Sequence, residues 1–264
     1  MISVSALTIY PVKSLGGVQL QSVHLDRFGF AGDRRWMVVN ENHRFLSQRE
    51  LAAMALITAE LTHSGLRLGS GKQSLLVSQP QASAPSLRVQ VWEDSVVALD
   101  AGSEAAEWLS ERLGRSCKLV YMTEDVHRYV DGLYAREGET VSFADGFPVL
   151  LISQASLDDL NSRLDTPVPM NRFRPNLVVQ GCEAFAEDNW RRVRIGGVEF
   201  TVAKPCSRCV MPSIDQVTAT KNSEVLQVLA GYRRADDRQV YFGQNLVYSG
   251  IGELSVGDTL EILK

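Results

Sequence analysis

The chain has 264 residues and a formal net charge of −4, with 45% hydrophobic and 22% charged residues. This composition is typical of a folded globular protein and excludes a disordered or fibrous one. The acidic balance argues against a nucleic-acid partner, because such binders are usually basic. No apolar run approaches the ~20 residues that span a bilayer, and the N-terminus alternates like a strand rather than a secretory signal. We therefore expect a cytoplasmic protein without a membrane partner.

The first hundred residues predict a series of short strands. Alternating or apolar runs bounded by turn residues indicate strands over 2–10, 18–25, 36–40, 55–61, 65–69, 74–78, 87–92 and 95–99. Several short strands joined by tight turns favour a barrel or a sandwich over alternating strands and helices.

The rest of the chain predicts three helices among further strands. The helices are expected over 104–113 with Ser103 as cap, 154–164 with Ser153 as cap, and 222–230 ending at Gly231. Strands are expected over 117–122, 148–152, 176–180, 191–195, 198–203, 240–248 and 254–263, the last with a turn at 256–258. The expected fold class is mainly β with a few helices (α+β), and the polar stretch from Thr123 to Thr140 suggests a domain boundary near it.

The most specific local feature is a pair of cysteines in Lys204-Pro205-Cys206-Ser207-Arg208-Cys209. A zinc site is weakly supported, because structural zinc needs four ligands. Only Cys117 and Cys182 remain as further thiols, and the four histidines are scattered singly. A thioredoxin-like dithiol is also weakly supported, because such a pair opens a helix and Pro212 would break that helix. Two other interpretations stay open. One cysteine alone is a soft thiolate ligand or nucleophile, favoured by the flanking Lys204 and Arg208, or both are small apolar residues at a strand end.

Cationic side chains also stand at the ends of predicted strands. Lys13 and Ser14 follow the first strand at a turn set by Pro11, which suits anion binding but also an ordinary surface turn. Arg34 and Arg35 precede strand 36–40, so alternation predicts that one of them faces inward and needs Asp33 or a bound anion as partner.

A further arginine, Arg174, is held at the mouth of strand 176–180 by Pro175. There it can contact a phosphate or form a salt bridge with an acidic residue. Together, the lysine, serine, arginine and cysteine side chains at these strand ends suit an anionic, phosphate-bearing cofactor with a soft reactive atom. Hydrolysis by general acid–base catalysis is poorly supported, because no histidines or paired carboxylates stand at the spacing it needs.

Seven motifs occur in an order that resembles the MOSC-domain family of YcbX-like proteins and mitochondrial amidoxime-reducing components. They are Tyr-Pro-Val-Lys-Ser (10–14), Gly-Asp-Arg (32–34), Ser-Phe-Ala-Asp-Gly-Phe-Pro (142–148), Ala-Ser-Leu-Asp-Asp-Leu-Asn (155–161), Arg-Phe-Arg-Pro-Asn (172–176), Lys-Pro-Cys-Ser-Arg-Cys (204–209) and Phe-Gly-Gln-Asn (242–245). The resemblance implies a MOSC N-terminal β domain over 1–120 and a MOSC β-barrel domain over 121–264.

The same resemblance implies a molybdenum cofactor, a pterin phosphate that carries molybdenum on a dithiolene. Its single protein ligand to the metal maps onto Cys209, which would be both the metal ligand and the catalytic residue. The family's cofactor contacts map onto Lys13, Ser14, Arg34, Gly146, Phe147, Arg174, Asn176, Ser207 and Arg208. Gly146 and Phe147 would contribute backbone groups only.

The implied activity is the two-electron reduction of N-hydroxylated small molecules such as hydroxylamines and amidoximes. The sequence ends without the Cys-x₄-Cys-x₂-Cys run of a plant-type ferredoxin, so we expect electrons from a separate protein, a ferredoxin, a flavodoxin or a cytochrome b5-like protein with its reductase. After Cys209 the family usually has two threonines, whereas this chain has Val210 and Met211 followed by Pro212. Two alternatives are a persulfide carrier, although no pyridoxal-phosphate domain accompanies the motifs, and a non-catalytic module that binds the molybdenum cofactor.

Overall fold

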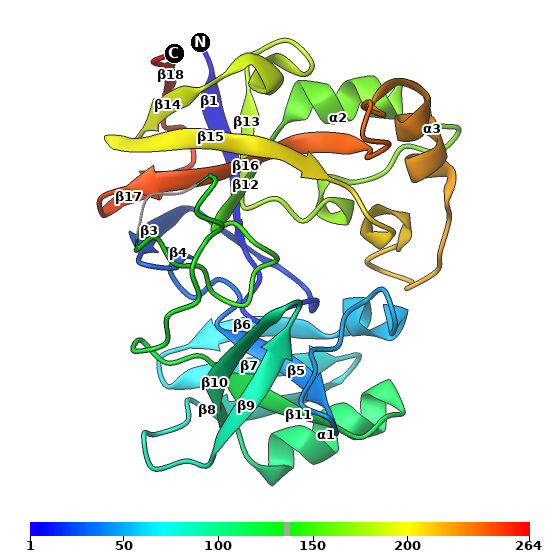
Figure 1. The fold of residues 1–264 in the computed structure, drawn as a ribbon. Coiled ribbons are helices and arrows are strands. Elements are labelled where there is room, and N and C mark those ends of the chain that lie inside the picture. The colour runs from blue at the N-terminus through cyan, green and yellow to red at the C-terminus, as the bar shows by residue number, and fades with distance from the viewer. Residues whose placement is uncertain (135–137) are drawn as a thin grey trace.

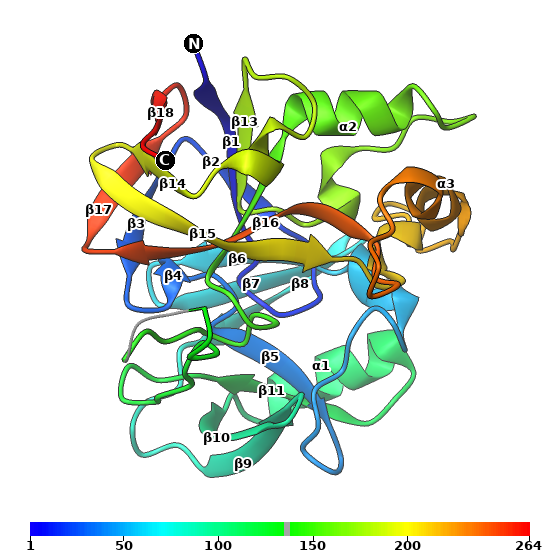
Figure 2. The same cartoon turned by 45° about the horizontal axis from the view of Figure 1, so that its top comes forward.

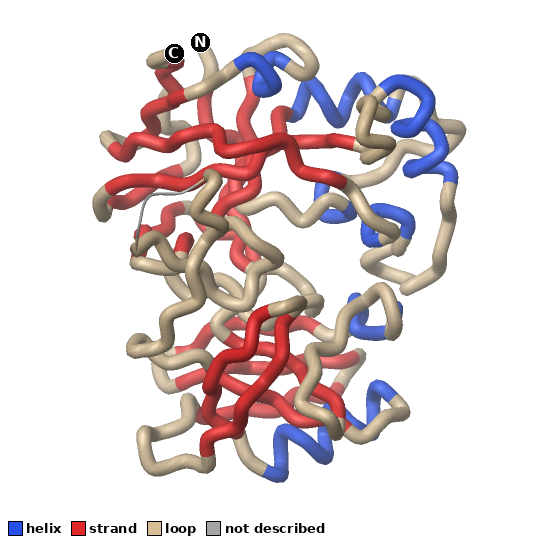
Figure 3. The backbone as a smooth tube through the Cα atoms, in the orientation of Figure 1, coloured by secondary structure: helices blue, strands red, loops and turns tan. Residues whose placement is uncertain are grey.

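The computed structural model describes residues 1–134 and 138–264 (Figure 1). Residues 135–137 fall in the polar stretch that suggested a domain boundary and lie outside the described residues. The fold is mainly β with a few helices, as predicted, and its strands form two lobes that meet along the middle of the molecule (Figure 3).

An eight-stranded sheet forms the C-terminal lobe, in the order β18-β14-β15-β16-β12-β13-β1-β2. Its strands are β1 (Ser3–Ile9), β2 (Val18–Leu20), β12 (Val149–Ser153), β13 (Leu177–Gln180), β14 (Arg192–Ile195), β15 (Val198–Ser207), β16 (Tyr241–Ser249) and β18 (Leu260–Ile262). A three-stranded sheet accompanies it, with β3 (Ser22–Asp26), β4 (Gly29–Phe30) and β17 (Gly252–Ser255). The first strand of the chain thus lies among strands from its second half.

The N-terminal lobe is built from two further sheets and one helix. They are β5 (Trp36–Asn40), β6 (Thr58–Thr62), β7 (Gly65–Ser70), β8 (Gln73–Ser78), β9 (Ser86–Val91), β10 (Asp94–Asp100), β11 (Cys117–Tyr121) and α1 (Ser103–Leu113). Strand alternation gives the β5 sheet two buried faces. Trp36 and Val38 pack towards β6–β8 and α1, whereas Met37 and Val39 pack against Phe28 and Phe143.

Two helices cover one end of the eight-stranded sheet, beside β16 (Figures 1 and 2). They are α2 (Gln154–Asn161) and α3 (Glu224–Tyr232). Leu157 and Leu160 of α2 and Val225 and Leu229 of α3 share one buried cluster with Phe242 of β16. Within the described ranges, no helix has the length and the apolar character that crossing a bilayer requires.

Several local predictions need correction. The residues Ala52–Leu56 form a 3₁₀ helix, η1, ahead of β6, where a strand over 55–61 was expected. Alanine favours helical backbone and explains the difference. The helix α1 is preceded by Gly102 and has no side-chain cap, whereas Ser153 caps α2 by accepting a hydrogen bond from the Ser156 amide, as predicted.

Three short 3₁₀ helices complete the list of elements: η2 (Met170–Arg172), η3 (Ala186–Asn189) and η4 (Met211–Ser213). Several predicted ends also move. The helix α2 ends at Asn161, where the prediction extends to residue 164, and α3 begins at Glu224 instead of residue 222. The helix α3 continues through Gly231 to Tyr232, and β15 runs to Ser207 instead of ending at residue 203. The predicted turn at 256–258 separates β17 from β18.

Candidate functional site

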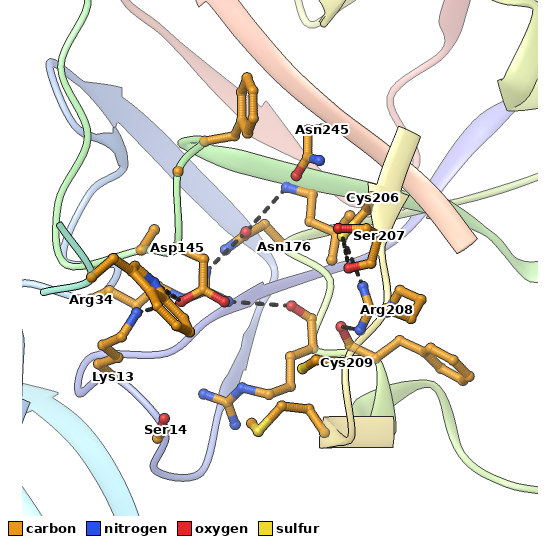
Figure 4. Close-up of a pocket in the computed structure, with 18 of the residues that line it drawn as sticks. Lys13, Ser14, Arg34, Asp145, Asn176, Cys206, Ser207, Arg208, Cys209 and Asn245 are labelled. Carbon is orange, nitrogen blue, oxygen red and sulfur yellow. Dashed lines mark hydrogen bonds and ion pairs between the residues drawn. The ribbon is translucent and has the colours of Figure 1, made fainter. Parts of the chain in front are cut away.

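A cavity of about 540 Å³ lies where the two lobes meet. All ten residues predicted for the site line it: Lys13, Ser14, Arg34, Gly146, Phe147, Arg174, Asn176, Ser207, Arg208 and Cys209. Figure 4 shows Lys13, Arg34 and Asp145 on one side of this pocket and Ser207, Arg208 and Cys209 on the other. The fold therefore brings together residues that lie up to two hundred positions apart in the sequence.

Backbone hydrogen bonds fix the turns that carry Lys13 and Arg34. The Lys13 amide donates to the Trp36 carbonyl, and the Arg34 amide donates to the Tyr10 carbonyl, both at 2.8 Å. The buried Asp33 joins the two turns, because its Oδ1 accepts from the Tyr10 amide and its Oδ2 accepts from Arg34 Nη1 at 2.6 Å. Asp33 is thus the partner that the sequence required for an inward-facing arginine.

The neighbouring Arg35 points away from the pocket but is not exposed, in contrast to the alternation expected for the pair. Its guanidinium is buried, donating to the Met122 carbonyl and to Glu124. Arg34 has a φ of 49°, which is a turn conformation rather than a strand conformation. The alternation rule therefore does not apply to these two residues.

Arg174 is only 7% exposed and has a φ of 56°. Its Nη1 donates to the Leu15 carbonyl at 2.7 Å, and its guanidinium lies 4.0 Å from the centre of the Tyr10 ring. Its Nη2 is buried and has no hydrogen-bond partner among the described residues. Burial, with a smaller contribution from Arg34, lowers the pKa of Arg174 to about 10. An anion at this atom would satisfy the free donor and offset the cost of burying the charge.

Asn176 connects the same region to the sheet. Its Oδ1 accepts from Arg34 Nη1 at 3.1 Å and from the Leu150 amide at 3.3 Å, while its Nδ2 donates to the Thr8 carbonyl. A residue with this many internal partners holds the pocket wall in place.

The cysteine pair stands at the end of β15, which pairs with β16 through two register shifts. Arg208 donates through Nη2 to the Phe173 carbonyl at 2.8 Å and through Nη1 to Cys206 Sγ at 3.1 Å, and its Nε is buried without a partner in the described part of the chain. Because Cys206 lies within a strand, the pair does not open a helix as a thioredoxin-like dithiol would.

The zinc interpretation receives no support from the other thiols. Cys117 packs in a hydrophobic cluster of the N-terminal lobe, and Cys182 packs against the core of the C-terminal lobe. No group of three or more histidine, cysteine, aspartate or glutamate side chains that could hold a metal occurs in residues 1–134 and 138–264.

Asp145 brings a carboxylate into the pocket. Lys13 Nζ lies 2.5 Å from its Oδ1, and the same ammonium donates to the Phe143 carbonyl at 2.7 Å. Burial lowers the pKa of Lys13 to about 8 despite this ion pair. Partial desolvation within the pocket opposes ionisation of Asp145, but Lys13 and Arg49 together hold the pKa of this carboxyl well below its usual range. Asp145 is therefore ionised at neutral pH and accepts hydrogen bonds.

Gly146 and Phe147 follow Asp145 on the pocket wall. A side chain at Gly146 would meet no atom within 4 Å, so the wall is open there. The ring of Phe147 lies 5.9 Å from that of Tyr134, and Lys204 Nζ lies above both rings. The ring of Phe147 thus packs against Tyr134 and Lys204, and its backbone role toward a cofactor stays a prediction.

The predicted set leaves out further lining residues, among them Arg49, Trp92, Asp145 and Lys204. Asp145 and Lys204 belong to motifs quoted above, so their membership was a usable signal. Arg49 and Trp92 come from turns of the N-terminal lobe, and no local pattern indicates that they reach the pocket. Arg49 contacts Cys209 in residues 206–209, the cysteine loop, and Trp92 contacts Asp145.

The segment after Cys209 is ordered by its own contacts. Asp215 Oδ1 accepts from the amides of Val217 and Thr218, and its Oδ2 lies 2.7 Å from Arg172 Nη2. Met211 lines the pocket at the start of η4. Although the usual threonines are absent, the loop is thus held by an aspartate and a buried arginine.

Comparisons with known proteins place these observations in a family. The MOSC N-terminal beta barrel domain matches residues 1–116, and the MOSC domain matches residues 138–261. "Mitochondrial amidoxime-reducing component 1" of Mus musculus is 33% identical over 280 residues, which cover 99% of this chain and 82% of the relative. Its counterpart in Homo sapiens is 31% identical over 99% of this chain and 83% of the relative. "Mitochondrial amidoxime reducing component 2" of Bos taurus is 32% identical over 97% of this chain and 82% of the relative. The chain therefore belongs to the family of MOSC-domain proteins that includes the amidoxime-reducing components.

Proposed function

We propose that this protein is an oxidoreductase that reduces N-hydroxylated compounds with a molybdenum cofactor. The observation that carries the proposal is the convergence of the Cys209 thiol with the cations Lys13, Arg34, Arg174 and Arg208 in a single cavity, which Cys206 also lines. The names of the relatives supply the reaction, since they are called amidoxime-reducing components.

The residues of the cavity fit a phosphate-bearing group. Arg174 Nη2 and Arg208 Nε are buried donors without a partner among the described residues, which is costly unless an acceptor arrives. Arginine donors match phosphate oxygens in geometry as well as in charge. Lys13, Ser14 and Ser207 add an ammonium and two hydroxyls on the same walls.

The thiol fits the metal of such a group, because a cysteine thiolate is a soft ligand. Cys209 would be the one protein ligand to molybdenum. Arg34, Arg174 and Arg208 would neutralise the phosphate, with Asn176, Gly146 and Phe147 forming the wall beside them.

When bound, the cofactor supplies the two-electron chemistry, and the protein binds and orients the reactants. The overall reaction is R–NHOH + 2e⁻ + 2H⁺ → R–NH₂ + H₂O, in which the N–O bond breaks and nitrogen is reduced. Asp145 faces the pocket as a carboxylate and can accept a hydrogen bond from an N–H or O–H group of the substrate.

Three further assignments belong to the proposal. The electrons come from a separate electron-transfer protein, a ferredoxin, a flavodoxin or a cytochrome b5-like protein with its reductase. A cytoplasmic location remains a prediction. The domain boundary at residue 120 also remains a prediction, and β1 crosses it in space, because this strand lies in the sheet of the C-terminal lobe.

The proposed function is tested by substituting the proposed ligand. Wild-type protein and Cys209→Ala, both expressed with ample molybdate, are assayed for reduction of benzamidoxime to benzamidine with reduced methyl viologen as electron donor. We expect turnover in the wild type and its complete loss in the variant. Cys206→Ala is the matched control and should retain most of the activity. Equal turnover in Cys209→Ala and wild type would contradict the assignment.

A further inference from the structure

A single arginine of the N-terminal lobe, Arg49, contacts two polar groups of the pocket, the Cys209 thiol and the Asp145 carboxylate. Arg49 Nε donates to Cys209 Sγ at 3.2 Å, and Arg49 Nη2 lies 3.3 Å from Asp145 Oδ2. The two contacts use different nitrogen atoms of one rigid, planar group. They therefore fix the thiol and the carboxylate relative to each other.

The side chain of Trp92 supports the Arg49 guanidinium. This guanidinium lies 4.5 Å from the centre of the Trp92 ring, and Trp92 Nε1 donates to Asp145 Oδ1 at 3.2 Å. Trp92 stands at the two-residue turn between β9 and β10 with a φ of 55°. A bulky residue rarely adopts this conformation, so the turn retains a strained residue whose indole supports both partners of the ion pair.

The backbone that carries Arg49 is equally constrained. The neighbouring Gln48 is fully buried and donates to the Ser14 carbonyl at 2.8 Å. Its side-chain amide also exchanges two hydrogen bonds with Gln216, at 3.1 and 2.9 Å, beyond the cysteine loop. Lys221 Nζ lies 3.5 Å from the Arg49 carbonyl. The turn that bears Arg49 is thus attached to the segment that follows the cysteine loop, whereas its side chain contacts Cys209 in that loop.

We infer that Arg49 is a positioning residue for the reaction at Cys209. It orients the sulfur and the Asp145 carboxylate from the opposite lobe and completes a site that the C-terminal lobe alone would leave loose. The part of this inference that concerns the metal rests on the proposed function. A sulfur ligand that accepts an N–H hydrogen bond donates less electron density to its metal, and such outer contacts tune metal sites.

The first test requires no cofactor. Hydrogen–deuterium exchange is measured on the full cofactor-free chain for wild type, Arg49→Gln and Arg44→Gln. Arg44 lies in the same segment, and its exposed guanidinium lies above the Phe45 ring outside the pocket, so Arg44→Gln is a matched loss of charge. We expect exchange in residues 207–213 to rise about fivefold in Arg49→Gln and to stay at the wild-type rate in Arg44→Gln. Wild-type exchange in Arg49→Gln would overturn the positioning role, whether or not the protein binds molybdenum.

The second test uses the molybdenum-loaded proteins. Electron paramagnetic resonance of Mo(V), generated by partial reduction, reports the environment of the sulfur ligand. In Arg49→Gln we expect shifted g-values and a loss of about 10-fold in kcat/KM, at molybdenum contents close to wild type. Arg49→Lys keeps the charge but cannot make both contacts, so it should resemble Arg49→Gln rather than wild type. Unchanged g-values and unchanged turnover at equal metal content would overturn the inference, whereas absence of molybdenum from the wild type would contradict only the proposed function.

Discussion

Buried cations dominate this protein at the scale of single residues. Lys13 and Arg174 are buried, and the guanidinium groups of Arg174 and Arg34 lie 4.0 and 4.6 Å from the centre of the Tyr10 ring. Burial of several like charges costs free energy unless anions compensate them. Asp33 and Asp145 compensate part of this charge, and the remaining donors point to a ligand that supplies more negative charge.

The lysine gives the site a pH dependence whose sign follows from its pKa. Burial lowers the pKa of Lys13 from 10.5 to about 8, so the unloaded protein loses this positive charge as the pH rises through 8. An anionic cofactor binds the protonated form more tightly, and its affinity should fall above that pH. Molybdenum retained after dialysis should therefore be lower at pH 9.5 than at pH 7 in wild type. Lys13→Arg stays charged and should show a smaller difference; identical pH profiles would contradict the role of Lys13.

Arg174 tests the phosphate site directly. Arg174→Ala removes a buried donor and should cut molybdenum content by at least about 10-fold, because a charged hydrogen bond to an anion contributes about 1.5–3 kcal/mol. Arg172→Ala is the comparison within the same motif, since Arg172 contacts Asp215 and the Pro212 carbonyl outside the cofactor contacts. Full metal retention in Arg174→Ala would count against its assignment.

The sequence allowed prediction of those residues that end strands. Lys13, Arg34, Arg174 and Arg208 combine charge with a position next to a strand, so a local pattern reveals them. Arg49 could not be found in this way. Its partner Cys209 lies 160 positions away, and only the packing of the two lobes brings the two together.

At the scale of elements, strand ends and turns build the site. The strands of the eight-stranded sheet were predictable one by one, but their order was not. One edge of β1 pairs with the next strand, β2, whereas the other edge pairs with β13 from the second half of the chain. Local periodicity reports which face of a strand is buried but not which strand lies beside it. The extension of β15 to Ser207 escaped prediction for a related reason: the polar residues after Ala203 pair with β16 at the pocket edge.

The motif Phe242-Gly243-Gln244-Asn245 on β16 shows how closely these strands approach. Gly243 has a φ of 80°, and a side-chain carbon there would lie 2.8 Å from the Leu151 carbonyl oxygen and 2.6 Å from Ile152. Gly243→Ala should lower the free energy of unfolding by roughly 2 kcal/mol or more, as measured by urea denaturation. Gly197→Ala provides a control, because its φ is 81° but its added carbon meets no atom within 4 Å. Equal destabilisation of the two variants would show that backbone strain alone, rather than the contact with β12, explains the glycine.

At the scale of the whole molecule, the pocket is shared between the lobes. Lys13, Arg34, Arg49 and Trp92 come from the first hundred residues, whereas the cysteine loop comes from the last seventy. A ligand in this cavity contacts both lobes at once, so its binding free energy stabilises their association as well as each lobe.

Cofactor binding should therefore raise the thermal stability of the entire chain. Because a ligand that binds only the folded state stabilises it by about 2.7 kcal/mol at a hundredfold excess over its Kd, the melting temperature should rise by roughly 5–10 °C. Differential scanning calorimetry of loaded and cofactor-free protein measures this shift, with a single transition expected in the loaded form. Equal melting temperatures would argue against a ligand that connects the lobes.

The most direct test of the account is the molybdenum content of wild-type protein and Cys209→Ala, both expressed with ample molybdate and measured by elemental mass spectrometry. We predict close to one molybdenum per chain in the wild type and a depleted metal content in the variant. Absence of molybdenum from wild-type protein purified under conditions that preserve the cofactor would contradict the account and favour a thiol that carries a persulfide.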